Sequence, residues 1–338
     1  MKYSIILIII LISIISLNFI GCNRKTNDTP VSGATPPAEN PLINKETSFQ
    51  IPSAKKLRSD LKVKADEKIN IIKTSKDDGE KKAALNELKT LCKENPSDFS
   101  LFSYLIENTD GNISKTGMEA LEKCYAGKMS EEEKAEEFEI LSCAVKHPID
   151  YIRCRAIVTM SYLSDNDERK EKQKTILRDS LKDKSCHVRI TAIERIGQTG
   201  DKEMTDKLKE IMNGNDEPQV IAASMRTLER FNVNITEKLI EFLGKKDPHV
   251  KACAVEILAR KKNKDVIPEL IKMLDDKTGT VIASKYDNEI TIIYSGTKQT
   301  LREMAIMALE AITGEKFGNN KDIDGTVAKW KEWYKKNK

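Results

Sequence analysis

The sequence is poor in the side chains that most often carry out chemistry. Its 338 residues include only three histidines, His147, His187 and His249, and nothing near them has metal-ligand spacing. No two cysteines form a Cys-x-x-Cys pair, and no cysteine spacing supports a catalytic thiol. These absences argue against an enzyme, a metal centre and a bound cofactor.

A concentrated basic patch is also missing. The chain has 57 lysines and arginines against 53 acidic residues, a net charge of +4, and opposite charges alternate along residues 202–210. Such alternation is typical of solvated helix faces. The densest basic stretch is C-terminal and Glu332 interrupts it: Lys329, Lys331, Lys335, Lys336 and Lys338. A nucleic acid is therefore not an expected partner.

One short pattern returns along the second half of the chain. The first copy runs Ile152-Arg153-x-x-Ala156-Ile157-x-x-Met160, and further copies begin at Val188, Val220, Val250 and Leu301. The first residues are 36, 32, 30 and 51 residues apart, close to one helical hairpin with a single long insertion. This predicts a stacked repeat protein, an architecture that presents extended surfaces rather than one closed pocket.

Each copy predicts a helix with one buried face. Its aliphatic and small residues fall at i, i+4, i+5 and i+8, and the small residue would let two helices approach closely. A second amphipathic helix is predicted after most copies. Glu217-Pro218 and Asp247-Pro248 place an acid before a proline at the expected helix starts, where proline loses no hydrogen bond. The predicted unit is helix, turn, helix.

Residues 246–258, Lys-Asp-Pro-His-Val-Lys-Ala-Cys-Ala-Val-Glu-Ile-Leu, resemble the HEAT-repeat family. The match is to its short bacterial form, also seen in phycobilin-lyase-like proteins, with the consensus Asp-Pro-x-Val-Arg-x-x-Ala. The resemblance covers residues 131–315 and implies an all-α, right-handed α-solenoid. It also implies a ladder of Asp and Arg side chains between repeats, which Ile221 and Cys186 would weaken by departing from the pattern. The family includes scaffolds, adaptors, transport receptors and a few enzymes.

The C-terminal segment is similar to the closing segment of many bacterial HEAT-repeat proteins. The similar residues are 309–318, followed by Trp330, Trp333 and Tyr334. Together with Val327, these aromatics fall at helical spacing and predict a final helix that packs them on the last repeat. An exposed aromatic ligand site is the less favoured alternative, because tryptophan has much apolar area to bury.

The N-terminus resembles a bacterial lipoprotein signal. An almost unbroken Ile/Leu run over residues 4–20 precedes Gly21 and Cys22. The resemblance implies cleavage between Gly21 and Cys22 and acylation of Cys22, which would give stable membrane anchoring. The alternative is an uncleaved transmembrane anchor, since the run is near the lower length limit of a span. Asn23, in place of an aspartate, slightly favours the outer membrane where two membranes are present.

Six cysteines remain beside Cys22: Cys92, Cys124, Cys143, Cys154, Cys186 and Cys253. Four of them lie among apolar helix positions, where free buried cysteine is common. Six cysteines can pair in fifteen ways, so the sequence leaves their disulfide state open.

An insertion separates the last two copies of the pattern. Residues 280–283 and 289–294 are rich in Val, Ile, Thr and Tyr, and Asp287-Asn288 between them suits a tight turn. This predicts a β-hairpin that serves either as a contact element or as a cover for the last repeat interface.

The predicted organisation assigns residues 1–21 to the signal peptide, 22–51 to the lipidated cysteine and a disordered tether, 52–130 to an N-terminal helical cap, 131–276 to HEAT-like repeats, 277–296 to the hairpin, and 297–338 to the last repeat and capping helix. The function that fits is a membrane-anchored, non-catalytic scaffold or adaptor for an envelope protein or peptide. A lyase-like enzyme or enzyme accessory and a passive structural lipoprotein are the alternatives.

Overall fold

The computed structural model describes residues 49–51, 56–124, 129–245, 247–281, 298–318 and 322–337. The chain divides into two units, Met1–Thr47 and Ser48–Lys338, and every described residue belongs to the second. The predicted signal peptide, Cys22 and most of the tether lie outside the described residues. Within these ranges no helix combines the length and the hydropathy needed to cross a bilayer.

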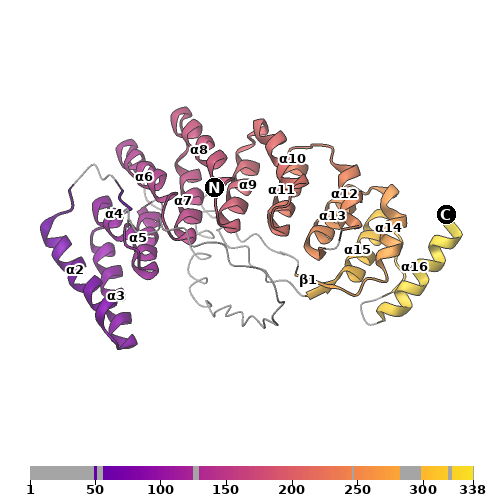
Figure 1. Cartoon of the computed structure of the whole chain (residues 1–338), viewed down its shortest axis with the longest axis horizontal. Coiled ribbons are helices and arrows are strands. Elements are labelled where there is room, and N and C mark those ends of the chain that lie inside the picture. The colour runs from indigo at the N-terminus through magenta and orange to yellow at the C-terminus, as the bar shows by residue number, and fades with distance from the viewer. Residues whose placement is uncertain are drawn as a thin grey trace, which may run out of the picture. The chain divides into compact units, whose positions relative to one another are not determined.

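The described part is an all-α stack with one short pair of strands (Figure 1). Its odd-numbered helices are α3 (Asp78–Glu94), α5 (Gly111–Cys124), α7 (Asp150–Leu163), α9 (Cys186–Thr199), α11 (Pro218–Arg230), α13 (Pro248–Arg260) and α15 (Leu301–Thr313). Its even-numbered helices are α2 (Ser59–Thr74), α4 (Phe99–Ile106), α6 (Glu131–Ala144), α8 (Asp167–Ser180), α10 (Thr205–Asn213), α12 (Thr236–Leu243), α14 (Ile267–Met273) and α16 (Ile323–Asn337).

The odd-numbered helices form the central layer of the stack. Each packs on the next odd-numbered helix and on the even-numbered helix before it. The repeated pattern explains why: Ile152 at its first position and Ala156, Ala192, Ala254 and Ala305 at its small position are all 0% exposed. A methyl group there allows close helix approach while still burying apolar area. The HEAT-like helical solenoid predicted from the sequence is confirmed.

The pairing within each hairpin differs from the prediction by one helix. The motif helix was expected to come first, yet α11, α13 and α15 pack on α10, α12 and α14, which precede them. The motif helix is therefore the second helix of its hairpin. The periodic pattern reports which helix face is buried but not which neighbour covers it, so it could not fix this order.

Helix α5 carries a degenerate copy of the pattern that the sequence alone did not predict. Ile113, Gly117, Met118 and Leu121 have the i, i+4, i+5, i+8 spacing and are buried. A Cβ on Gly117 would lie 2.8 Å from the Leu105 Cβ and 2.8 Å from the Phe102 carbonyl oxygen. Glycine thus takes the small position where α5 meets α4, and α3 and α5 extend the odd-numbered layer into the N-terminal helical region.

Gly117→Ala is expected to lower the free energy of unfolding by about 1–2 kcal/mol, because overpacking outweighs the better helix propensity of alanine. Gly111→Ala on the same helix is the matched control, since its added Cβ would meet only the Ile149 Cδ1 at 3.7 Å. Urea denaturation followed by circular dichroism measures both. Equal stability of the two variants would contradict the tight α4–α5 contact.

The two predicted helix starts are capped differently. Asp247 Oδ1 accepts hydrogen bonds from the backbone nitrogens of His249 and Val250, at 2.8 and 3.0 Å, as predicted for a capping acid. Glu217 makes no side-chain cap and bonds Arg189 instead. The acid before Pro218 therefore serves the contact between repeats rather than its own helix.

The C-terminal prediction is confirmed. Helix α16 packs on α14 and α15, and Trp330 is 0% exposed. Its ring centroid lies 4.6 Å from that of Phe317 and 5.4 Å from that of Trp333. The aromatics close the end of the stack.

The insertion contains a short antiparallel pair, β1 (Gly279–Val281) and β2 (Lys298–Thr300), with Gly279 opposite Thr300. Strand β1 packs on α13, and Thr300 ends β2 and caps α15 in a reciprocal box with Glu303. The predicted strand at 289–294 and the turn at Asp287 and Asn288 lie outside the described residues.

Candidate interaction surface

The basic residue at the second motif position joins neighbouring repeats. Arg153, 4% exposed, donates from Nε and Nη2 to the two Asp183 carboxylate oxygens at 2.8 and 2.7 Å. Its Nη1 donates to the carbonyl oxygens of His147 and Pro148. The bidentate contact between Arg153 and Asp183 joins α7 to the turn before α9.

The same contact recurs along the stack. Arg189 reaches Asp216 at 2.6 Å, Lys251 reaches Asp276 at 2.9 Å, and Arg302 reaches Asp324 at 2.6 Å. Ile221 breaks the series, as the HEAT resemblance led us to expect, and the Asp247 carboxylate caps α13 there. Cys186 does not weaken the ladder, contrary to expectation, because Asp183, not the helix-starting residue, accepts from Arg153.

Two ladder carboxylates have a lowered pKa. Burial by itself would raise the pKa of Asp276, but hydrogen bonds from Thr278 and Lys251 outweigh burial and lower it. The pKa of Asp216 is also lowered, where burial is outweighed by hydrogen bonds from Glu217 and Arg189. Both carboxylates therefore stabilise the fold above their unfolded pKa, and this stabilisation is lost as the pH falls through the folded pKa.

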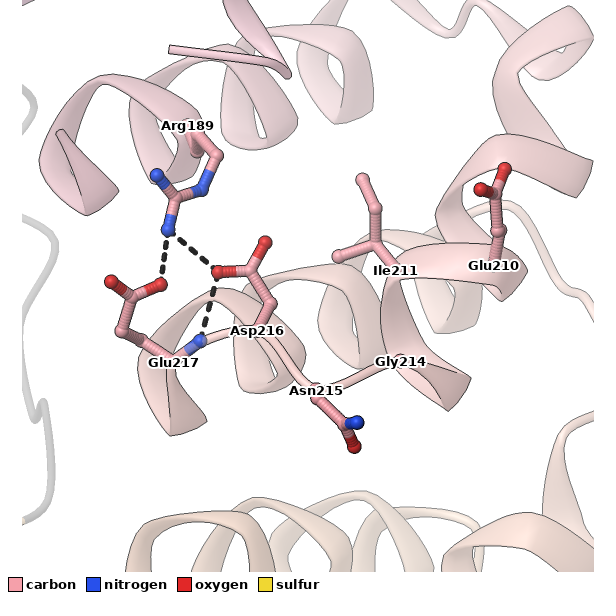
Figure 2. Close-up of a pocket in the computed structure, with 7 residues that line it drawn as sticks. All are labelled: Arg189, Glu210, Ile211, Gly214, Asn215, Asp216 and Glu217. Carbon is pink, nitrogen blue, oxygen red and sulfur yellow. Dashed lines mark hydrogen bonds and ion pairs between the residues drawn. The ribbon is translucent and has the colours of Figure 1, made fainter. Parts of the chain in front are cut away.

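An open depression of about 610 Å³ marks the ladder between α9 and α11 (Figure 2). Nη2 of Arg189 lies between the carboxylates of Asp216 and Glu217, while Glu210 and Ile211 of α10 form another part of the lining. The dashed contacts drawn there all involve Arg189, Asp216 and Glu217 and belong to the contact between repeats. The depression is best explained as the place where the ladder meets solvent.

The opposite side of the motif helices is solvent-exposed at one position in every copy. We number the motif from its first aliphatic residue, so that Arg153 is at position 2 and Ala156 at position 5. Position 11 is exposed in every copy, and we call these side chains the position-11 row: Lys123, Tyr162, Gln198, Arg230, Arg260 and Ala311. Position 7 lies one turn earlier on the same face. Its residues are Glu119, Val158, Glu194, Arg226, Glu256 and Met307.

Ion pairs cross this face from one motif helix to the next. Arg155 pairs with Glu122, and Arg226 lies 3.5 Å from Glu256. Arg260 lies 3.4 Å from Glu229. Glu122, Glu256 and Glu229 are thus each engaged by an arginine of an adjacent helix.

Glu194 is the central acid of this face. Burial raises its pKa to about 7, although the charges of Arg195, Arg226 and Arg230 act in the opposite direction. This carboxyl is therefore less fully ionised at neutral pH than an exposed glutamate, which reduces the negative charge beside these arginines.

The structure separates the three histidines. His187 and His249 take the same place, one residue before position 1, and the imidazole of His187 is 67% exposed. His147 follows α6 and is 1% exposed, with its ring 5.0 Å from that of Phe49. No group of three potential metal ligands occurs within the described ranges.

The six described cysteines are free thiols. Burial raises the pKa of Cys92 and Cys124 to about 12 and that of Cys154 and Cys253 to about 11. At pH 8 about one in a thousand or fewer of such thiols is ionised, so they are poor nucleophiles.

Cys186 is expected to react first with Ellman's reagent at pH 8. It is partly exposed at the start of α9, whereas Cys253 is 1% exposed and should react last. Absorbance at 412 nm follows the reaction. Cys186→Ser should remove the fastest phase, and an unchanged fast phase in that variant would contradict the assignment.

No family model and no curated protein matches this sequence. Among solved structures, YibA from Escherichia coli is 17% identical, with a TM-score of 0.47, over 83% of this chain and 99% of its own. The complex of CpcE and CpcF of phycocyanin lyase from Nostoc is 13% identical, with a TM-score of 0.33, over 90% and 99%. Neither likeness is close enough to transfer a function.

Proposed function

We propose that this chain is a lipid-anchored, non-catalytic scaffold or adaptor that holds an envelope protein or peptide along its helical stack. The observation that carries the proposal is the repetition of exposed side chains at equivalent motif positions from α5 to α15. A partner that lies along the stack would meet the same positions on successive helices. The membrane anchor rests on the lipoprotein-like sequence around Cys22, with the outer membrane slightly favoured.

Two exposed lysines of the even-numbered layer provide one test. Lys209 lies 3.3 Å from Asp206 on α10, and Lys272 lies 2.7 Å from Glu269 on α14. Each ion pair lies within one helix, so Lys209→Glu and Lys272→Glu should preserve the stack. If the partner lies over this layer, the reversals should reduce its recovery by affinity capture from cross-linked cells.

The predicted hairpin provides a second test. Deletion of residues 280–295 should abolish recovery of the partner by affinity capture if the insertion is a contact element. Recovery of the same stoichiometric partner from every variant would place the contact elsewhere. Recovery of lipid and the protein alone would favour a passive structural lipoprotein, whereas a co-purifying chromophore would favour a lyase-like role.

A further inference from the structure

The position-11 row is the most regular exposed feature of the described residues. It has one side chain on each motif helix, and none of the six is acidic. The residues one place before position 1 lack acids as well: Asn112, Tyr151, His187, Gln219, His249 and Thr300. Acids occur between these two rows at position 7, where Glu256 faces Arg226 and Glu194 lies beside Arg226 and Arg230.

Two arginines of the row can engage a ligand. No hydrogen bond or ion pair in the described ranges joins the Arg230 guanidinium to a carboxylate within 4 Å. Arg260 is 51% exposed and reaches Glu229 and Glu256 only at 3.4 and 3.9 Å. Exposed pairs of this length contribute little, so an incoming carboxylate can compete for Arg260 at low cost.

Arg230 lies at the end of α11, where this helix packs closely on α9. Gly197 of α9 lies beside it, and a Cβ on Gly197 would be 3.4 Å from Nη1 of Arg230 and 3.1 Å from Thr227. Thr227 donates to the Ile193 carbonyl oxygen at 3.3 Å, which ties α11 to α9. The arginine is therefore presented from a tightly packed helix pair rather than from a loop.

The spacing of the row suits an extended chain. Axes of packed helices are about 8–10 Å apart, and an extended peptide rises about 3.3 Å per residue. Three peptide residues span one step between motif helices. A segment of about twelve residues with an acid at every third position would meet the row from α5 to α13.

We propose that the position-11 row binds an extended acidic peptide segment of a partner protein, with Arg230 and Arg260 donating hydrogen bonds to its carboxylates. Lys123 supplies a further positive charge, and Tyr162 and Gln198 supply polar contacts between the charged ends. This inference rests on the proposed scaffold function and names the chemistry of its partner.

The test uses the full chain in detergent and a fluorescent twelve-residue peptide with glutamate at every third position and serine between. Fluorescence anisotropy should show binding that is lost when glutamine replaces glutamate and that weakens as salt rises. The double variant Arg230→Gln with Arg260→Gln should weaken binding about tenfold. Lys170→Gln with Lys174→Gln, on the even-numbered helix α8, removes the same amount of charge; it is the matched control and should bind the peptide as the parent does.

Three results would overturn the proposal: no binding of the glutamate peptide at low salt, equal binding of the glutamine peptide, or unchanged affinity in the double arginine variant. Binding of anionic vesicles or an oligonucleotide with the same arginine dependence, but not of the peptide, would also reject an acidic peptide. Partner capture from cells tests the scaffold proposal separately. If cells yield a stoichiometric partner that survives the double arginine substitution, the scaffold stands and the acidic peptide does not.

Discussion

Glu137→Gln is expected to stabilise the protein by about 4 kcal/mol at pH 8. The Glu137 side chain is 0% exposed, and neither carboxylate oxygen has a hydrogen-bond partner among the described residues. Burial, and secondarily the charge of Glu122, raises its pKa to about 8. The unfolded chain loses this proton near its ordinary pKa, whereas the folded chain retains it to a much higher pH. Glutamine removes that difference.

The stability difference between the parent and Glu137→Gln grows as the pH rises. Because the folded pKa is raised, the Glu137 carboxyl makes no ionisation-dependent difference to stability well below pH 4.5. Its destabilisation grows by about 1.4 kcal/mol per pH unit until the folded pKa near 8 is reached. Parent and variant should therefore differ most at pH 8–9 and least at pH 4.

Urea denaturation at several pH values tests this expectation. Glu132→Gln is the matched control, because Glu132 is exposed on the same helix. Other groups such as Glu194 titrate in both proteins, so the difference between variant and parent isolates Glu137. Parallel stability curves for the parent and Glu137→Gln would show that the carboxyl is solvated or paired.

Trp330→Ala is expected to release α16 from the stack and to cost about 3–5 kcal/mol of local stability. Trp330 is 0% exposed and packs on Phe317, while α16 packs on α14 and α15 at the end of the stack. In a repeat array the terminal element depends on its neighbour alone, so the loss should be confined to the C-terminal end.

Fluorescence reports this loss selectively, because the only two tryptophans of the chain lie on α16. In Trp330→Ala the emission of Trp333 should shift to longer wavelength under native conditions, while the helical signal in circular dichroism falls only slightly. Trp333→Ala is the control, since Trp333 is partly exposed and its removal should leave the Trp330 emission blue-shifted. An unshifted Trp333 in the first variant would contradict the capping role of Trp330.

The sequence predicted the motif helices because alanine or serine at position 5 stands out against aliphatic neighbours. It missed the copy of the motif in α5, where Gly117 takes the small position and Ser114 replaces the basic residue. The exposed side chains of the position-11 row follow from the same period, since position 11 lies opposite the buried residues of a helix. Extension of the motif by one further turn would have revealed them.

Other features depend on contacts that no local pattern reports. Glu137 sits in a helix whose first turn is acidic, so its sequence context resembles a solvated surface. Its burial arises because α6 packs against both α4 and α7. The ladder partner of Arg153 is thirty residues away, at Asp183, and depends on the turn that leads into α9. The burial of Glu137 and the pairing of Arg153 with Asp183 therefore depend on how the helices stack, which no single helix pattern predicts.

Photo-cross-linking in intact cells tests the scaffold claim most directly. A photoreactive residue would replace Gln198, in the exposed row, and Val63, which is 67% exposed on α2 and distant along the chain from that row. We expect one discrete cross-linked envelope protein from position 198, in stoichiometric yield, and a much lower yield of it from position 63. Cross-links to lipid alone, or the same unselective pattern from both positions, would contradict a dedicated partner along the motif helices.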